Sequence, residues 1–236
     1  MPIDHLPAGL RVLLAEDDAF LRRTTAQVLS GLNPKSVATA ENGKVALSFL
    51  NRNEIDLLIT DVQMPEMNGL ELIKQIRLGN TSGSPELRTI VVTSFSTLEV
   101  VAASLALDVN GFLVKPITPA SAASKIGIAM QERVSLKTRD TYQAVNTDLD
   151  SIALTAATQS SKVNAALPDG NRQAAYRAGG KTVSLEQLQP GMRLVENLTA
   201  KTGVALVTAG HELNESMINR IHELSEVIAA RYVRIQ

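Results

Sequence analysis

The sequence predicts an α/β fold, in which a five-stranded, doubly wound parallel sheet is followed by a helical linker and a small α+β module. Two observations predict the sheet. Short apolar runs bounded by turn-forming residues alternate with stretches of helical periodicity over residues 1–135. Four of these runs end in residues that carry chemistry, which is typical of strands at the active edge of an open α/β sheet. A third observation, the return of short alternating patterns over residues 181–236, predicts the separate module.

The central strand is expected over residues 55–60, where an apolar run leads into Asp61 and a Met64-Pro65 turn. An isolated Asp in that place would more often cap the next turn than carry a function. Asp61 is not isolated, because three other runs have the same form. They end in Glu16-Asp17-Asp18, in Thr93 and in Lys115.

Parallel strands would bring these polar side chains together at one edge of the sheet. Glu16, Asp17 and Asp61 would then repel one another unless a cation lay between them. Carboxylate oxygens suit Mg²⁺, which also keeps several of its waters, and the Lys115 ammonium would balance the remaining charge. The sequence therefore predicts a magnesium site at this edge, with Asp18 as the cap of the following helix.

At this point the motifs resemble a known family. Residues from about 10 to 130 resemble the receiver domain of bacterial two-component response regulators, which has a CheY-like, flavodoxin-like fold. The resemblance implies a protein of a phosphorelay that accepts a phosphoryl group from a histidine kinase or a phosphotransfer protein. The motifs that carry it are Glu16-Asp17, Asp61 with Met64-Pro65 and Gly69, Thr93-Ser94, Phe112 and Lys115-Pro116.

The resemblance also assigns roles to the site residues. It implies that Asp61 is the phosphoacceptor. It also implies that the Lys115-Pro116 peptide bond is cis, a form whose energetic cost is low only before proline. The hydroxyl of Thr93 is expected to bind a phosphoryl oxygen, and Lys115 is expected to pair with the phosphoryl group. The implied ligands of Mg²⁺ are Glu16, Asp17, Asp61 and the main-chain carbonyl of Gln63.

Phe112 has two interpretations. The resemblance implies a switch in which Thr93 moves toward the phosphoryl group and Phe112 fills the space that it leaves. The alternative is that Phe112 is an ordinary core residue of an apolar strand. The switch would change a surface formed by residues 98–107, the Phe112 strand and the helix after Pro119, which is the expected partner or dimer surface.

The elements of the sheet domain follow in order. Apolar residues recur at helical spacing after Asp18, and Gly31 and Pro34 end that helix. A Gly- and Ser-rich loop over 79–85 precedes the fourth strand. The expected strands are 11–15, 36–40, 55–60, 89–92 and 111–114, and the expected helices are 20–32, 44–50, 69–78, 98–107 and one that begins after Pro119.

The region 136–180 is expected to be a helical and flexible linker. Apolar residues from Tyr142 to Ala156 are spaced alternately three and four apart, which suits a short dimerising extension of the fifth helix. An amphipathic helix packed on the receiver suits the same pattern. Residues 160–180 are rich in Ala, Asn, Gln and Gly and predict a flexible connection.

The last module, 181–236, is expected to contain a β-hairpin and a helix. The sequence predicts a turn at 189–191 and strands over 192–198 and 204–208. It also predicts a helix that opens near Asn214 and carries Ile218 to Ile228, and a closing strand over 232–235. The segment 188–192 resembles a short sequence found in other bacterial regulators, often beside phosphohydrolase-type signalling domains.

Composition narrows the class of protein. The formal net charge is −1 and the chain contains no cysteine, which excludes disulfides and thiolate metal sites. No apolar run approaches the length of a membrane span, and residues 1–9 lack the features of a signal peptide, so a cytoplasmic protein is expected. The histidines His211 and His222 are expected to be surface residues rather than metal ligands.

The output is expected to be a protein partner or a homodimer. Residues 181–236 contain six basic and six acidic residues and no basic face, so DNA binding is not expected. No catalytic motif is recognisable in that module, so no enzyme is expected. Two alternatives stay open, a DNA-binding regulator with an unfamiliar output and a regulatory subunit of a nucleotide second-messenger enzyme. Salt-dependent DNA binding would favour the first, and stabilisation by nucleotides the second.

Overall fold

The structure is a computed structural model that describes residues 6–93, 98–132, 134, 136–152, 181–199, 205–207, 209–213, 215–223, 228 and 230–236. The chain divides into two compact units. One comprises Met1–Ser96 with Ala106–Asp148, and the other comprises Thr97–Leu105 with Leu149–Gln236. Within the part of the chain that is described, no helix is long and apolar enough to cross a membrane.

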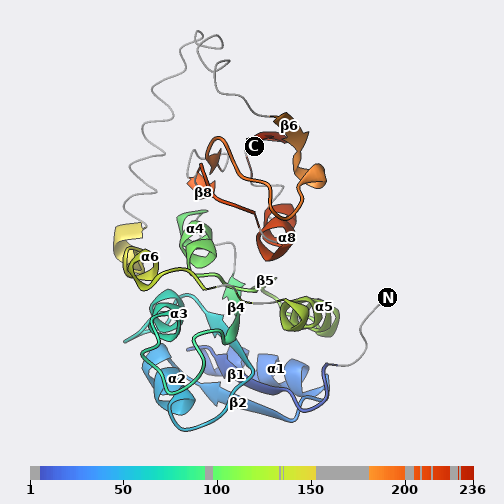
Figure 1. The fold of residues 1–236 in the computed structure, drawn as a ribbon. Coiled ribbons are helices and arrows are strands. Elements are labelled where there is room, and N and C mark those ends of the chain that lie inside the picture. Colours follow the sequence, from blue (N-terminus) through green and yellow to red (C-terminus); the bar gives the residue numbers. More distant parts are fainter. Residues whose placement is uncertain are drawn as a thin grey trace. The chain divides into compact units, whose positions relative to one another are not determined.

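The first unit is built on a five-stranded sheet in which every neighbouring pair of strands is parallel (Figure 1). The order β2-β1-β3-β4-β5 confirms the predicted doubly wound fold, because the chain starts near the middle and winds outward in both directions. The strands are β1 (Arg11–Ala15), β2 (Ser36–Ala40), β3 (Leu57–Asp61), β4 (Arg88–Thr93) and β5 (Gly111–Val114).

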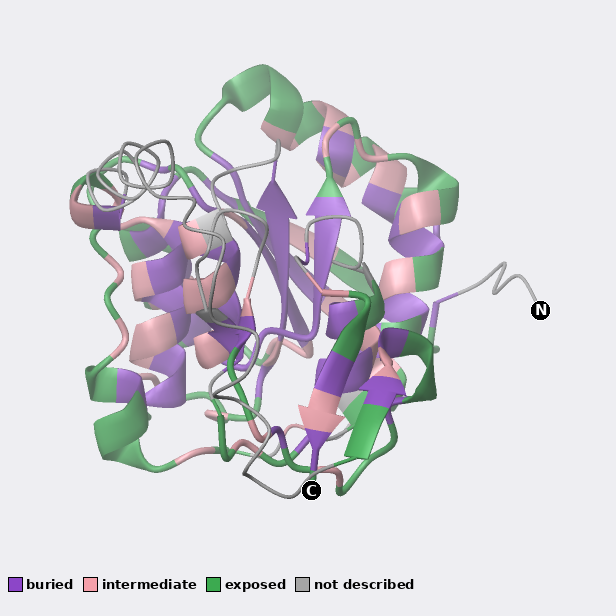
Figure 2. Ribbon diagram, turned by 90° about the horizontal axis from the view of Figure 1, so that it is seen from above, coloured by how far each residue is buried: buried purple, intermediate pink, exposed green. Residues whose placement is uncertain are grey.

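Helices cover the sheet on both faces, as buried parallel strands require. Helices α1 (Ala19–Ser30) and α5 (Pro119–Gln131) contact each other, as do α2 (Gly43–Leu50) and α3 (Gly69–Arg77). Most residues of the central strands are buried, whereas the helices are exposed on their outer sides (Figure 2). Helix α4 (Leu98–Ala106) has all but its last residue in the second unit.

Four helices that follow strand ends, α1, α2, α3 and α5, each start at a polar cap. The side chains of Asp18, Asn42, Asn68 and Thr118 each accept a hydrogen bond from a main-chain N–H of the first turn. Such a cap stabilises a helix by about 1 kcal/mol and fixes where the chain turns from loop to helix. The prediction that Asp18 caps the first helix is therefore confirmed.

A buried arginine ties α3 to the neighbouring loops. Arg77 has 3% of its surface exposed, although charged residues are rarely buried to this degree. Its guanidinium satisfies carbonyl groups that no strand or helix pairs. It donates hydrogen bonds to the carbonyls of Leu107 (3.0 Å), Pro85 (2.7 Å), Leu87 (2.8 Å) and Asp108 (2.9 Å) and to the hydroxyl of Thr89 (3.1 Å).

The chain after α5 folds back onto the first unit as a strap, which we define as residues 136–148. Its anchor is Tyr142, which is 1% exposed and donates a hydrogen bond of 2.7 Å to the carboxylate of Asp108. The ammonium of Lys137 pairs with the other oxygen of Asp108 at 2.8 Å, and the amide of Lys137 donates to the Tyr142 hydroxyl. Burial and the Asp108 carboxylate raise the pKa of Tyr142.

The strap also follows the length of α3. The ammonium of Lys74 donates to the carbonyls of Gln143 and Val145, at 2.8 and 2.7 Å. The amide of Asn68, the cap of α3, donates to the carbonyl of Thr147 at 2.8 Å. One end of the strap therefore lies at the start of the helix that follows Asp61.

The strap corrects one prediction. A continuous helical extension of α5 is wrong, because α5 ends at Gln131 and the next helix, α6, covers only Arg139–Gln143. The alternative of a helix packed on the receiver is what the structure has, in a shorter form. Of the residues that make up the three- and four-residue spacing, Tyr142 and Ile152 are buried, and Val145 and Leu149 are half-buried. Residues 153–180, including Ala156 and the predicted flexible segment 160–180, lie outside the described residues.

The second unit contains two small antiparallel pairs and a helix. Strand β6 (Lys181–Ser184) pairs with β9 (Tyr232–Ile235), and β7 (Leu198–Thr199) pairs with β8 (Ala205–Val207). The short helix η1 (Leu185–Gln187) follows β6. The predicted strand over 192–198 is present only in part, because Arg193 and Leu194 form isolated bridges there and Leu198 begins β7. Helix α8 (Glu215–Glu223) confirms the predicted helix, but Ile228 lies beyond it.

Replacement of Arg77 by Met should lower the free energy of unfolding by about 3 kcal/mol or more, since several buried carbonyls lose their donor. Urea denaturation measures this value. The matched control is Arg23→Met, on the exposed side of α1, which should change stability by less than about 0.5 kcal/mol. Equal effects of the two substitutions would contradict the structural role of Arg77.

Replacement of Tyr142 by Phe should loosen the strap, because Asp108 and Lys137 both lose the hydroxyl. Hydrogen exchange at the amides of Tyr142 and Ala144, which bond to carbonyls within the strap, should accelerate about fivefold to tenfold. Tyr232→Phe is the control, since Tyr232 is 64% exposed. Unchanged exchange in Tyr142→Phe would show that packing alone holds the strap.

Candidate functional site

The carboxyl ends of the strands bring the predicted site residues together at one edge of the sheet. Ala15, which precedes Glu16, is level with Thr60, which precedes Asp61. On the other side of β3, Asp61 is level with Val92, the neighbour of Thr93. The amide of Lys115 donates to the carbonyl of Thr93 at 3.0 Å. The predicted convergence is therefore what the sheet produces.

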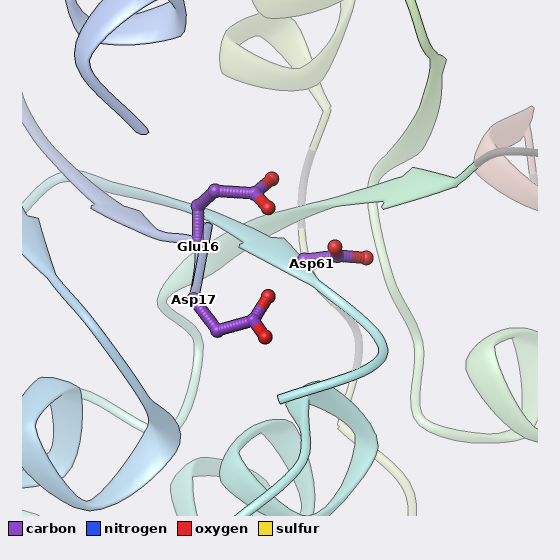
Figure 3. Close-up of side chains that lie close together, drawn as sticks. All are labelled: Glu16, Asp17 and Asp61. Atoms are coloured by element: carbon purple, nitrogen blue, oxygen red, sulfur yellow. The ribbon is translucent and has the colours of Figure 1, made fainter. Parts of the chain in front are cut away.

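Three carboxylates face one another at this edge (Figure 3). Glu16, Asp17 and Asp61 each place an oxygen within 4.8 Å of the others. Their environments differ, since Glu16 is buried, Asp61 is half-buried and Asp17 is exposed. Burial raises the pKa of Glu16, and the neighbouring Asp61 charge adds to that effect, against the opposing hydrogen bond from Lys115. The site thus concentrates negative charge where water cannot fully screen it.

Lys115 supplies the balancing charge from the end of β5. Its ammonium lies 2.7 Å from Oδ2 of Asp61 and 2.8 Å from Oε2 of Glu16. Burial works to lower the pKa of Lys115, but the hydrogen bonds to Asp61 and Glu16 outweigh it, and the pKa is raised. Lys115 is therefore a fixed cation. The peptide bond between Lys115 and Pro116 is cis, as predicted.

The backbone around Asp61 leaves no space for a side chain on its neighbour Gly69. A Cβ atom on Gly69 would lie 2.0 Å from the carbonyl oxygen of Asp61. The amide of Gly69 donates to the carbonyl of Val62, and the amide of Val62 donates to Oδ1 of Asp61 at 2.6 Å. The start of α3 is thus in contact with the end of β3, and Gly69 is required for that approach.

The remaining predicted residues occupy distinct places. Thr93 is buried at the end of β4, next to the strand that carries Asp61. Phe112 is buried on β5, level with Val91. Gln63 is exposed in the loop between β3 and α3.

Two polar side chains that the sequence reasoning missed hold the loops of the site. Arg22 donates from Nη1 to the carbonyls of Glu16 and Asp17, at 2.7 and 3.0 Å. Asn42, which is buried, donates to Glu66 in the loop after Asp61 at 2.9 Å. A basic residue one turn into the helix after an acidic pair is the only sequence signal for Arg22. For Asn42 the sequence signal is weaker, since its position predicts only a helix cap.

The donor set fits a magnesium ion. Three carboxylates from two neighbouring strand ends offer hard oxygen ligands at short mutual distances, and Mg²⁺ is held in proteins by a few carboxylates and retained waters. Lys115 bonds the carboxylates of Glu16 and Asp61, whereas Asp17 is exposed and therefore accessible to a hydrated ion.

Comparison with known proteins agrees with this geometry. The family described as response regulator receiver domain matches residues 12–126. The chemotaxis protein CheY1 of Helicobacter pylori is 34% identical over 122 residues, which is 51% of this chain and 97% of that protein. A CheY homologue of Campylobacter jejuni is 37% identical over 111 residues, covering 47% of this chain and 84% of that protein.

A third relative, the chemotaxis protein CheY-3 of Vibrio cholerae, is 29% identical over 121 residues, or 51% of this chain and 92% of that protein. All three matches cover about half of this chain and nearly all of the relative. The sheet order, the acidic edge and these relatives lead to one conclusion. The chain belongs to the response regulator receiver family of two-component signalling.

Proposed function

We propose that this protein is a response regulator that accepts a phosphoryl group on Asp61 from a histidine kinase or a phosphotransfer protein. One observation carries the proposal. Asp61 ends the central strand, and its carboxylate is bonded by the fixed cation Lys115 and lies close to the carboxylates of Glu16 and Asp17. A carboxylate in this place is surrounded by groups that suit a phosphate.

The proposed reaction is a phosphoryl transfer between two proteins. An oxygen of Asp61 attacks the phosphorus of a phosphohistidine, the phosphorus–nitrogen bond breaks, and the imidazole leaves with the bonding electron pair. The product is an acyl phosphate on Asp61. Bound Mg²⁺, held by Glu16, Asp17, Asp61 and the carbonyl of Gln63, supplies charge neutralisation for the phosphoryl oxygens. Lys115 supports the same charge from the opposite side.

Thr93 and Phe112 are proposed to report the phosphoryl group to the rest of the molecule. A phosphoryl oxygen on Asp61 offers the Thr93 hydroxyl a charge-assisted hydrogen bond. Phe112 lies on the next strand, so a shift of Thr93 frees space beside it. The mechanism is a local packing change driven by a new charge.

The output is proposed to be association with a protein partner or with a second copy, without a catalytic activity of residues 181–236. The charge of that module supports this proposal, since six basic and six acidic residues give it no excess for a polyanion. The same proposal divides the chain into a receiver domain over 1–135, a linker over 136–180 whose strap packs on the receiver, and an output module over 181–236.

Phosphorylation should require Asp61 and should change association. Treatment with acetyl phosphate and Mg²⁺ should add one phosphoryl group to the wild type by intact mass spectrometry, and none to Asp61→Asn. Light scattering with beryllofluoride and Mg²⁺ should then show a mass increase in the wild type alone. The cause is that beryllofluoride mimics the phosphoryl group only on an intact carboxylate.

The matched control for Asp61→Asn is Asp18→Asn, which also removes one carboxylate near the site. Asn caps a helix as well as Asp does, so this variant should take up the phosphoryl group like the wild type. Phosphoryl uptake by Asp61→Asn would overturn the assignment of Asp61. Uptake without a mass change would retain Asp61 and exclude self-association as the output.

Replacement of Lys115 by Met should tighten the binding of Mg²⁺ and slow phosphoryl transfer. The ammonium of Lys115 occupies oxygens of Glu16 and Asp61, so its removal frees these ligands and deletes a competing charge. Calorimetric titration should give a dissociation constant for Mg²⁺ that is at least about threefold lower. The change in free energy is then smaller than the interaction of two unit charges in contact at a protein surface. Weaker binding of Mg²⁺ in this variant would show that Lys115 orients the ligands instead.

A further inference from the structure

Glu16 and Asp17 reach the site from a short loop that has little support of its own. The loop joins β1 to α1, and its one sheet-type bond is donated by the amide of Glu16 to the carbonyl of Ala40 at 3.1 Å. The repulsion among three carboxylates acts to push this loop away from Asp61. Something on the far side of the loop has to oppose that displacement.

Arg22 binds the main chain of this loop and not its carboxylates. Its main-chain amide donates to the carbonyl of Asp18 at 2.8 Å, while its guanidinium returns to the carbonyls of Glu16 and Asp17. One residue in the first turns of α1 therefore binds three consecutive carbonyls of the loop. The carbonyls then point toward α1, which fixes the direction in which the two side chains leave the backbone.

We propose that Arg22 is a positioning residue for the magnesium site, which it serves by holding the backbone of Glu16 and Asp17 so that their carboxylates converge with Asp61. The inference rests on the proposed function, since it takes the acidic cluster as the metal site. It adds a residue that touches neither the metal nor the phosphoryl group. Residues that orient metal ligands typically affect affinity about 10-fold to 100-fold when removed.

The sign of the effect separates positioning from simple charge. A guanidinium near the site repels a divalent cation, so its removal would tighten the binding of Mg²⁺ if charge alone mattered. If positioning dominates, its removal weakens the binding. Lys115 is expected to act in the first way because it contacts carboxylates, whereas both side-chain bonds of Arg22 end on main-chain oxygens. The two cations should therefore have opposite effects.

Calorimetric titration of the full chain with MgCl₂ tests the inference. Arg22→Ala should raise the dissociation constant for Mg²⁺ about 10-fold or more, and Arg22→Lys should give a smaller increase because one ammonium replaces the planar guanidinium. Arg23→Ala, the neighbouring exposed arginine, should stay within about twofold of the wild type. With acetyl phosphate, saturating Mg²⁺ should restore most of the phosphorylation rate of Arg22→Ala, because Asp61 and Lys115 are intact.

Three outcomes overturn the inference. They are unchanged or tighter binding of Mg²⁺ by Arg22→Ala, equal weakening in Arg23→Ala, and a low phosphorylation rate that saturating Mg²⁺ does not restore. If Arg22→Ala melts below the wild type without metal, Arg22→Lys decides the question under the same criteria. Failure of the proposed function looks different, since the wild type and Asp17→Asn would then bind Mg²⁺ equally weakly.

Discussion

The repulsion among Glu16, Asp17 and Asp61 is the interaction on which the structure of the site depends. A parallel sheet places their strand ends side by side, and burial of Glu16 strengthens the conflict by reducing solvent screening. A positive charge bound to the carboxylates and hydrogen bonds to the main chain of the loop oppose this repulsion. Lys115 binds the carboxylates directly, and Arg22 holds the backbone behind two of them.

The supports of the site come from several elements and share one property. Helix caps, the Gly69 contact and the bond from Asn42 to Glu66 all fix main-chain positions in the loops at the strand ends. Loops at such an edge have no ladder to hold them, so their shape depends on side chains from the adjoining helices. The acidic edge is therefore a property of the whole first unit and not of three residues.

The sheet and the acidic edge could be predicted from the sequence because both depend on local patterns, namely apolar runs and the residues that end them. Arg22 could not be predicted, because its partners are carbonyl groups, which every residue has. The apolar spacing from Tyr142 to Ala156 suited both a dimerising extension of the fifth helix and a helix packed on the receiver, because either arrangement buries one face of a helix. The stretch 192–198 has an alternating pattern, yet it forms only isolated bridges at Arg193 and Leu194 and the first residue of β7. The closing strand β9 pairs along its length with β6 instead.

The strap has a consequence for any shortened form of the protein. Composition suggests a cut shortly after α5, but the compact unit continues to Asp148. A receiver that stopped near residue 135 would lack Lys137 and Tyr142, and the Asp108 carboxylate would keep neither partner. A fragment that ends after Asp148 keeps both, together with the bonds from Lys74 and Asn68. The compact unit thus extends beyond the family match, which ends at residue 126.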